Sequence, residues 1–142
     1  MQKPTVWVSL SAILLAAVCA AAQAPRTVWD GVYNREQAER GEKLYRQECG
    51  RCHGDDLGGI ESAPALSGST FAATWDGVPL SDLLERMRVS MPQDKPGSLS
   101  RIQNAEILAY MLQLSGFPAG EKPLEGQAAA LSQITYRTYR PD

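Results

Sequence analysis

Histidine and cysteine are scarce in this sequence: its 142 residues include one histidine, His53, and three cysteines, Cys19, Cys49 and Cys52. A zinc site needs four ligands drawn from cysteine, histidine and carboxylate side chains, and iron–sulfur clusters commonly need four cysteines. Because Cys19 lies in an apolar N-terminal segment, a zinc site would be one ligand short unless a carboxylate completed it. A disulfide between Cys49 and Cys52 would close almost no loop in the unfolded chain. A chemical role therefore explains this cysteine pair better than a structural disulfide does.

The N-terminal apolar run, from Val6 to Ala20, is shorter than the ~20 residues of a comfortable membrane span. It follows Lys3 and precedes the small residues that end at Ala24, a pattern typical of a secretory signal peptide. We predict cleavage after Ala24, so that residues 1–24, with Cys19, are removed and the protein reaches the periplasm. The alternative is a lipoprotein anchored at Cys19, although a bulky valine before the cysteine fits that processing poorly.

The sequence also lacks an excess of basic residues, with 14 Lys and Arg against 16 Asp and Glu. Lys3 is the one charged residue among the first 24, so residues 25–142 carry a formal net charge of −3. No basic patch indicates nucleic-acid binding. The 118 residues that remain after cleavage fit one compact domain, and no second domain is expected.

No strand-like alternation and no internal repeat are present. Asn34 and Gln37 are spaced as a capping box, which predicts a helix from that point. Its inward face has positions three or four apart: Ala38, Gly41, Tyr45 and Cys49. Gly41 has no side chain, so another helix could approach it closely. The helix delivers residues 49–53 at its C-terminal end.

Residues 54–79 are rich in Gly, Ser and Pro, and we predict one long ordered loop there. Residues 80–87 have apolar side chains at helical spacing, and this short helix should end before Ser90-Met91-Pro92. A second capping box, Ser100 with Gln103, opens a last helix that ends at Gly116. In the tail after it, a small packing turn is expected at three apolar positions: Ala128, Leu131 and Ile134.

Cys49-Gly-Arg-Cys52-His53 is the attachment signature of c-type haem. Each thiol can add across a porphyrin vinyl group, and the adjacent imidazole becomes the proximal iron ligand. A thioredoxin-like redox pair would need a βαβ setting, which this sequence does not offer. We therefore predict one covalently attached haem c, with His53 on the iron.

The sixth iron ligand separates an electron carrier from a site that binds small molecules. The candidates are three methionines: Met87, Met91 and Met111. Met111 lies among apolar residues in mid-helix and Met87 completes the apolar stripe of its own helix, so both are expected to be core residues. Met91 precedes Pro92 in an extended segment, from which a loop can present the thioether. We favour Met91; Met87 or an open iron is the alternative.

The sequence resembles class I c-type cytochromes, in particular the single-haem periplasmic cytochromes associated with quinoprotein dehydrogenases. Gly41 and Tyr45 before the motif, Met91-Pro92 after it, and residues 108–118 are similar to that family. The resemblance implies an all-α fold with three main helices and long loops around one haem. The cytochrome domain would span 35–118, with an N-terminal extension at 25–34. Residues 119–142 would be a tail that packs on the domain or is used for docking.

The resemblance also implies roles for Pro64 and Trp75. Pro64 resembles the proline whose carbonyl accepts a hydrogen bond from the proximal histidine, although it could be a plain loop proline. Trp75 resembles an aromatic residue near a haem propionate, although a simple core role is open. The family's lysine-rich docking face is not evident in this acidic chain.

These features predict a protein that is not an enzyme and that transfers electrons through a haem with His53/Met91 ligation. Its donor would be a periplasmic dehydrogenase and its acceptor an oxidase or another cytochrome, without stable membrane insertion. One alternative is a haem enzyme or gas sensor with a displaceable sixth ligand, suggested by the Gly/Pro-flanked loop from Ser90 to Gly97. Another is a fixed dehydrogenase subunit held by the tail.

Overall fold

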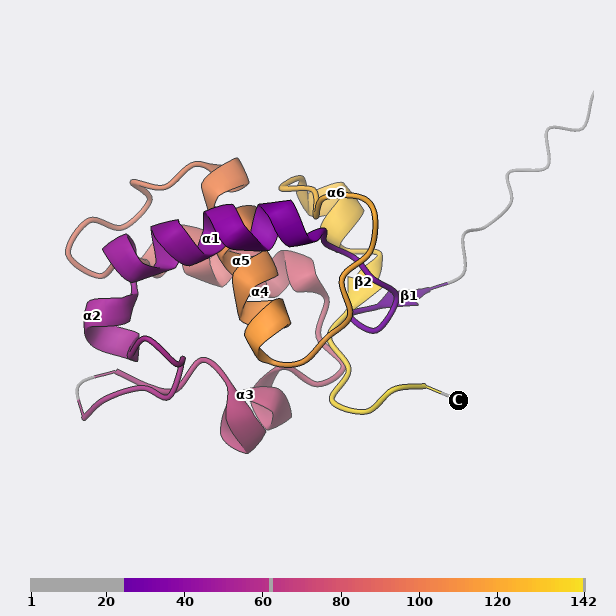
Figure 1. The fold of residues 1–142 in the computed structure, drawn as a ribbon, viewed down its shortest axis with the longest axis horizontal. Helices are drawn as coiled ribbons and strands as arrows, with labels where there is room; N and C mark the ends of the chain where they lie inside the picture. The colour runs from indigo at the N-terminus through magenta and orange to yellow at the C-terminus, as the bar shows by residue number, and fades with distance from the viewer. Residues whose placement is uncertain (1–24, 62, 142) are drawn as a thin grey trace, which may run out of the picture.

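The computed structural model describes residues 25–61 and 63–141, so the predicted signal peptide and Cys19 lie outside the described residues. The fold is helical (Figure 1). Its elements in chain order are β1 (Arg26–Thr27), α1 (Arg35–Glu48), α2 (Gly50–His53), α3 (Gly68–Trp75), α4 (Leu80–Ser90), α5 (Arg101–Leu114), α6 (Ala128–Leu131) and β2 (Ile134–Thr135). The three longest helices, α1, α4 and α5, confirm the predicted all-α architecture. Within these described ranges, no helix combines the length and apolar character that crossing a membrane requires.

The two predicted helix starts are confirmed, but only one is a complete capping box. At α5 the Ser100 hydroxyl accepts from the Gln103 backbone N–H, and the Gln103 side chain accepts from the Ser100 backbone. At α1 the Asn34 side chain accepts from the Gln37 backbone N–H at 3.0 Å. The Gln37 side chain does not reach back, because it is buried against the tail and binds Leu124.

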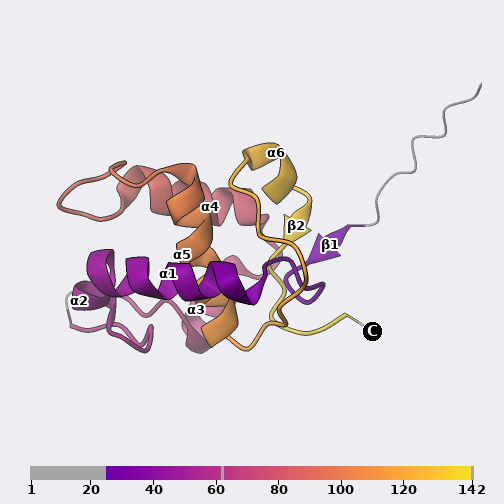
Figure 2. The same ribbon diagram turned by 45° about the horizontal axis from the view of Figure 1, so that its top comes forward.

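Helices α1 and α5 cross in close contact, as Figures 1 and 2 both show. A side-chain carbon on Gly41 would collide with the backbone carbonyl of Glu106, so the crossing requires glycine at that point. One turn further along each helix, the Tyr45 and Tyr110 rings lie 5.4 Å apart. The predicted close approach of another helix at Gly41 is correct, and the contact on α5 is the backbone of Glu106.

The prediction of a continuous loop over 54–79 is wrong, because residues 68–75 form α3. Intrinsic propensity for a helix is weak here, since the segment contains Gly68 and several Ser and Thr residues. Tertiary contact overrides it: the Phe71 ring packs against Trp75 and against Tyr136 of the tail, both at 6.1 Å. Sequence reasoning missed this helix because its partner lies far along the chain.

The tail packs on the helices and contains a short strand that the sequence did not predict. β2 pairs in parallel with β1, with Arg26 opposite Ile134 and Thr27 opposite Thr135. In the expected packing turn, Leu131 and Ile134 are buried, but Ala128 is exposed. Two-residue strands have no alternation to read, so pattern analysis could not find them.

Gln37 joins α1 to the tail through both polar groups of its side chain. Its Nε2 donates to the Leu124 carbonyl at 2.8 Å, and its Oε1 accepts from the Leu124 N–H at 2.7 Å. Gln37→Ala leaves two buried backbone groups without partners, so we expect it to lower the free energy of unfolding by about 2–4 kcal/mol. Chemical denaturation followed by circular dichroism measures this. Glu39→Ala, at an exposed position on the same helix, is the control, and equal losses in the two variants would contradict the assignment.

Candidate haem-binding site

The end of α1 and the single turn of α2 place the motif residues on one compact corner. Cys49 caps α1, and its backbone N–H donates to the Tyr45 carbonyl at 2.8 Å. The chain then turns into α2, which ends at Gly54 with φ 76°, a conformation that favours glycine. The Tyr45 hydroxyl donates to the Gly54 carbonyl at 2.7 Å and so ties this corner back to α1.

The single histidine is held in one orientation. His53 is 6% exposed, and its Nδ1 lies 2.8 Å from the Pro64 carbonyl oxygen. A carbonyl oxygen can only accept, so Nδ1 carries the proton and donates. The other ring nitrogen, Nε2, then keeps its lone pair for a metal, and the hydrogen bond fixes the ring and strengthens it as a donor. This geometry is the one that the resemblance implied for Pro64.

A tight loop brings Pro64 to the histidine, and sequence reasoning did not single out its main support. The Gly59 backbone N–H donates to the His53 carbonyl at 2.8 Å. Gly59 has φ 75°, and a side-chain carbon on it would meet the Ala63 carbonyl at 2.9 Å and the Pro64 carbon at 2.8 Å. Glycine is therefore required for Pro64 to reach His53. The pair Gly58-Gly59 in the sequence was the available signal.

A cavity of about 800 Å³ opens beside these residues. This volume lies in the upper part of the roughly 300–1,000 Å³ typical of ligand and cofactor sites. The walls come from α1, α2, α3, α4, α5 and the connecting loops, and they are mainly apolar. They include all the residues named in the sequence analysis as haem contacts: Cys49, Cys52, His53, Pro64, Trp75 and Met91.

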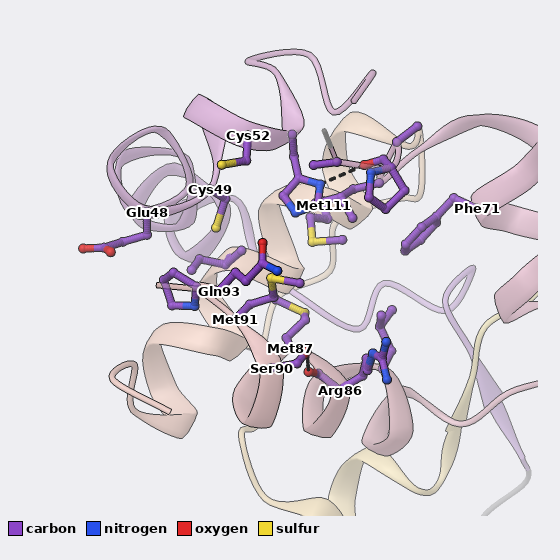
Figure 3. Close-up of a pocket in the computed structure, with 18 of the residues that line it drawn as sticks. Glu48, Cys49, Cys52, Phe71, Arg86, Met87, Ser90, Met91, Gln93 and Met111 are labelled. Atoms are coloured by element: carbon purple, nitrogen blue, oxygen red, sulfur yellow. Dashed lines mark hydrogen bonds between the residues drawn. The ribbon is translucent and has the colours of Figure 1, made fainter. Parts of the chain in front are cut away.

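All three candidate methionines line this cavity. Met111 is buried in the hydrophobic core and Met87 packs against that core, as expected, and both also face the cavity. In Figure 3 the sulfur atoms of Met87, Met91 and Met111 point into the space that Phe71 bounds on one side. Met91 has the predicted extended backbone, with φ −126° and ψ 153°, and caps α4 through its N–H to the Met87 carbonyl at 2.9 Å. Helical spacing cannot distinguish a side chain facing the protein core from one facing a cofactor cavity.

The two ends of the cavity differ in chemistry. Cys49 and Cys52 stand at one side in Figure 3, and Phe71 and the end of the Arg86 side chain stand at the other. Trp75 and Thr74 of α3 line the cavity as well. The vinyl groups and the propionates of haem lie at opposite edges of the porphyrin. A haem attached through the cysteines would therefore direct its carboxylates away from them, toward a wall that offers an arginine. The residues present fit this group.

The electrostatics near the motif follow from burial. Burial, together with the nearby charges of Glu48 and Cys52, raises the pKa of the free Cys49 thiol to about 11. This side chain therefore stays a thiol at neutral pH. Residues 25–61 and 63–141 contain no group of three or more His, Cys, Asp and Glu side chains arranged to hold a metal ion, so the zinc alternative finds no ligand set there.

Buried tyrosines make the stability of this region sensitive to alkaline pH. Burial raises the pKa of Tyr33, Tyr45, Tyr110 and Tyr136. Their stabilising effect is complete below the unfolded-state pKa of about 10 and is lost as the pH rises above it. We expect the free energy of unfolding to fall above that pH. Tyr45→Phe should cost about 1 kcal/mol at pH 7 through its lost hydrogen bond, and it should make the alkaline fall shallower.

Denaturant titrations of the holoprotein between pH 7 and 11 test this expectation. Tyr139→Phe is the matched control, because Tyr139 is 84% exposed. An alkaline fall of the same slope in Tyr45→Phe as in the parent protein would show that Tyr45 does not contribute to it.

Comparison with known proteins agrees with this geometry. Residues 36–111 match the model of the family described as cytochrome c oxidase, cbb3-type, subunit III. No curated protein sequence gives a significant match. Among solved structures, the chain is similar to the sulfane dehydrogenase SoxCD from Paracoccus pantotrophus, with a TM-score of 0.53 and 22% sequence identity. The alignment covers 80% of this chain and 66% of that chain, and at this identity it shows the fold alone.

The family match covers more than half of the chain and includes the attachment motif, Pro64, Trp75 and Met91. Together with the helical fold, it confirms the resemblance to class I c-type cytochromes. The chain therefore belongs to this cytochrome c family, carries covalently bound haem c, and serves haem-based electron transfer.

Proposed function

We propose that the protein is a single-haem electron carrier in which His53 and Met91 are the axial iron ligands. Cys49 and Cys52 are the attachment residues. Met91 lines the cavity on the side opposite α2 (Figure 3). The observation that carries the proposal is the His53–Pro64 hydrogen bond at 2.8 Å, which leaves Nε2 available beside a cavity that Met91 also lines. When bound, the haem supplies a one-electron change between ferric and ferrous iron.

The side chains around the cavity favour an electron carrier over a catalyst. The neutral sulfur of Met91 raises the reduction potential, and the apolar walls disfavour the additional charge of the ferric state. Pro64 orients the imidazole and makes it a stronger donor. With both axial positions occupied by protein side chains, no site is left for a substrate at the iron. Trp75 and Arg86 are then expected beside the propionate edge.

The redox partners and location form the second part of the proposal. The signal-peptide pattern in residues 1–24 supports export to the periplasm, with a dehydrogenase as electron donor and an oxidase or another cytochrome as acceptor. The structural match to a protein titled a sulfane dehydrogenase supports a link to dehydrogenases in general. Residues 35–118 would form the cytochrome domain. The tail makes contacts within its own chain, through Leu124 and Tyr136, which favours packing over docking to a larger subunit.

The second candidate function is a haem enzyme or gas sensor in which the sixth ligand is displaced. The observation in its favour is the loop that follows Met91, in which residues 93–98 are all exposed. An optical titration of the reduced holoprotein with carbon monoxide decides between the two. We expect no spectral change at carbon monoxide concentrations that would saturate an open haem, because Met91 occupies the iron and must first be displaced. Ready binding of carbon monoxide would overturn the carrier proposal in favour of sensing or catalysis.

A further inference from the structure

Two ion pairs join residues 48–53, called the attachment corner below, to the loop that follows Met91. Arg51 Nη2, in the middle of the Cys-x-x-Cys-His motif, lies 2.6 Å from Asp94 Oδ2. Lys95 Nζ lies 2.7 Å from Glu48 Oε2, at the last residue of α1. These are called the two loop ion pairs below. Glu48, Arg51 and Asp94 all line the cavity, so the pairs span its rim.

Little else holds this part of the loop to the protein. Residues 93–98 are exposed, and the backbone hydrogen bonds of Lys95 and Ser98 are local, to Pro92 and Lys95 respectively. The loop becomes buried again only at Leu99, whose carbonyl accepts from the Asn104 side chain at 3.1 Å. Between Pro92 and Leu99, the polar contacts with residues 48–53 among the described residues are therefore the two loop ion pairs.

The order of the charges specifies one register of the loop. The attachment corner presents an acid and then a base, Glu48 and Arg51, and the loop presents an acid and then a base, Asp94 and Lys95. The two pairs are thus of opposite polarity. A loop position that exchanged the partners would place Glu48 against Asp94 and Arg51 against Lys95, which is repulsive at both points.

We infer that the two loop ion pairs position Met91 at the iron by holding its loop in this register against the attachment corner. Arg51, Asp94, Glu48 and Lys95 are positioning residues that act through Met91, so the inference rests on the proposed axial ligation. Loss of a pair lets the loop move away from the rim, and the thioether then leaves the iron more readily. Because the pairs are exposed, with side chains 61% and 52% exposed for Arg51 and Asp94, their effect depends on ionic strength.

The expected effect of losing an ion pair on Met91 displacement follows from the free energy that exposed ion pairs contribute. One such pair shifts an equilibrium by up to about fivefold. A charge reversal also adds repulsion from the neighbouring pair, since Arg51→Glu places a second acid beside Glu48 and opposite Asp94. We expect Arg51→Glu and Asp94→Arg each to make displacement of Met91 by carbon monoxide about 5–20-fold easier. The double swap Arg51→Glu/Asp94→Arg should restore the parent value to within about threefold.

The experiment uses the holoprotein with two readouts that report the iron–sulfur bond. One is the sulfur-to-iron charge-transfer absorption of the ferric protein. The other is the carbon monoxide concentration at which half of the ferrous protein is converted, measured at low and high salt. Lys43→Glu is the matched control, since it makes the same charge change on the exposed side of α1 and no ion pair of Lys43 is present in residues 25–61 and 63–141. High salt should weaken Met91 retention in the parent protein, where it screens attraction, and should not weaken it in Arg51→Glu, where it also screens the repulsion that the new acid introduces.

The outcomes separate this inference from the proposed function. If the parent protein lacks the charge-transfer band, Met91 is not the ligand and both proposals fail. If the band is present but Arg51→Glu and Asp94→Arg behave like Lys43→Glu, the ion pairs do not position Met91 and only this inference fails. Failure of the double swap to recover would likewise overturn it, because the effect would then come from net charge and not from pairing. The salt titration of the parent protein needs no variant and tests the same point.

Discussion

Gly41→Ala is expected to lower the free energy of unfolding by about 3 kcal/mol or more, although the same change in an ordinary exposed helix position stabilises by roughly 0.5–1 kcal/mol. The sign reverses because a side-chain carbon on Gly41 would overlap the Glu106 carbonyl, which belongs to the backbone of α5 and cannot rotate away. The helices would have to separate, and the contacting rings of Tyr45 and Tyr110 would move with them.

Chemical denaturation of the holoprotein measures this effect. Lys43→Ala, at an exposed position two residues further along α1, is the control and should change stability by less than about 0.5 kcal/mol. A Gly41→Ala variant as stable as the parent would show that α1 and α5 do not cross in contact at this point. Because the crossing supports the corner that carries Cys49, we also expect a lower yield of haem-loaded protein for Gly41→Ala.

The parts of the fold that sequence predicts are those encoded by neighbouring residues. Capping by Asn34 and Ser100 depends on side chains that reach three residues along the chain, so the starts of α1 and α5 could be predicted. The helix α3 and the pairing of β1 with β2 could not, because Phe71 packs on Tyr136 and Arg26 pairs with Ile134. The partners in these contacts are 65 and 108 positions apart, and no local pattern signals them.

In the candidate site, too, local features could be predicted from the sequence and contacts between distant residues could not. The spacing of Cys49, Cys52 and His53 is local chemistry and could be read directly. The hydrogen bond to Pro64 came only from the family resemblance, since nothing in the sequence places that carbonyl 2.8 Å from the ring. The loop ion pairs were not predicted, because Arg51 and Asp94 meet only after the chain has passed through α3 and α4.

Met91→Leu is expected to let carbon monoxide bind the ferrous protein fully, at a concentration that leaves the spectrum of the parent protein unchanged. A ligand that occupies the iron about 99% of the time lowers the apparent affinity of a competitor about 100-fold, so its removal raises that affinity by the same factor. Leucine has nearly the volume of methionine, so the change in packing alone should cost less than about 1.5 kcal/mol of stability. The reduction potential should fall as well, because the soft sulfur no longer favours ferrous iron.

The three methionines of the cavity give this prediction its own controls. Met87→Leu and Met111→Leu make the same change on the neighbouring helices α4 and α5, and both residues line the same space. If Met91 is the ligand, these two variants keep the charge-transfer band and the resistance to carbon monoxide, whereas Met91→Leu loses both. If Met87→Leu opens the iron instead, the ligand comes from the last turns of α4. The extended backbone at Met91 then serves only to end that helix, and the loop ion pairs lose the role inferred for them.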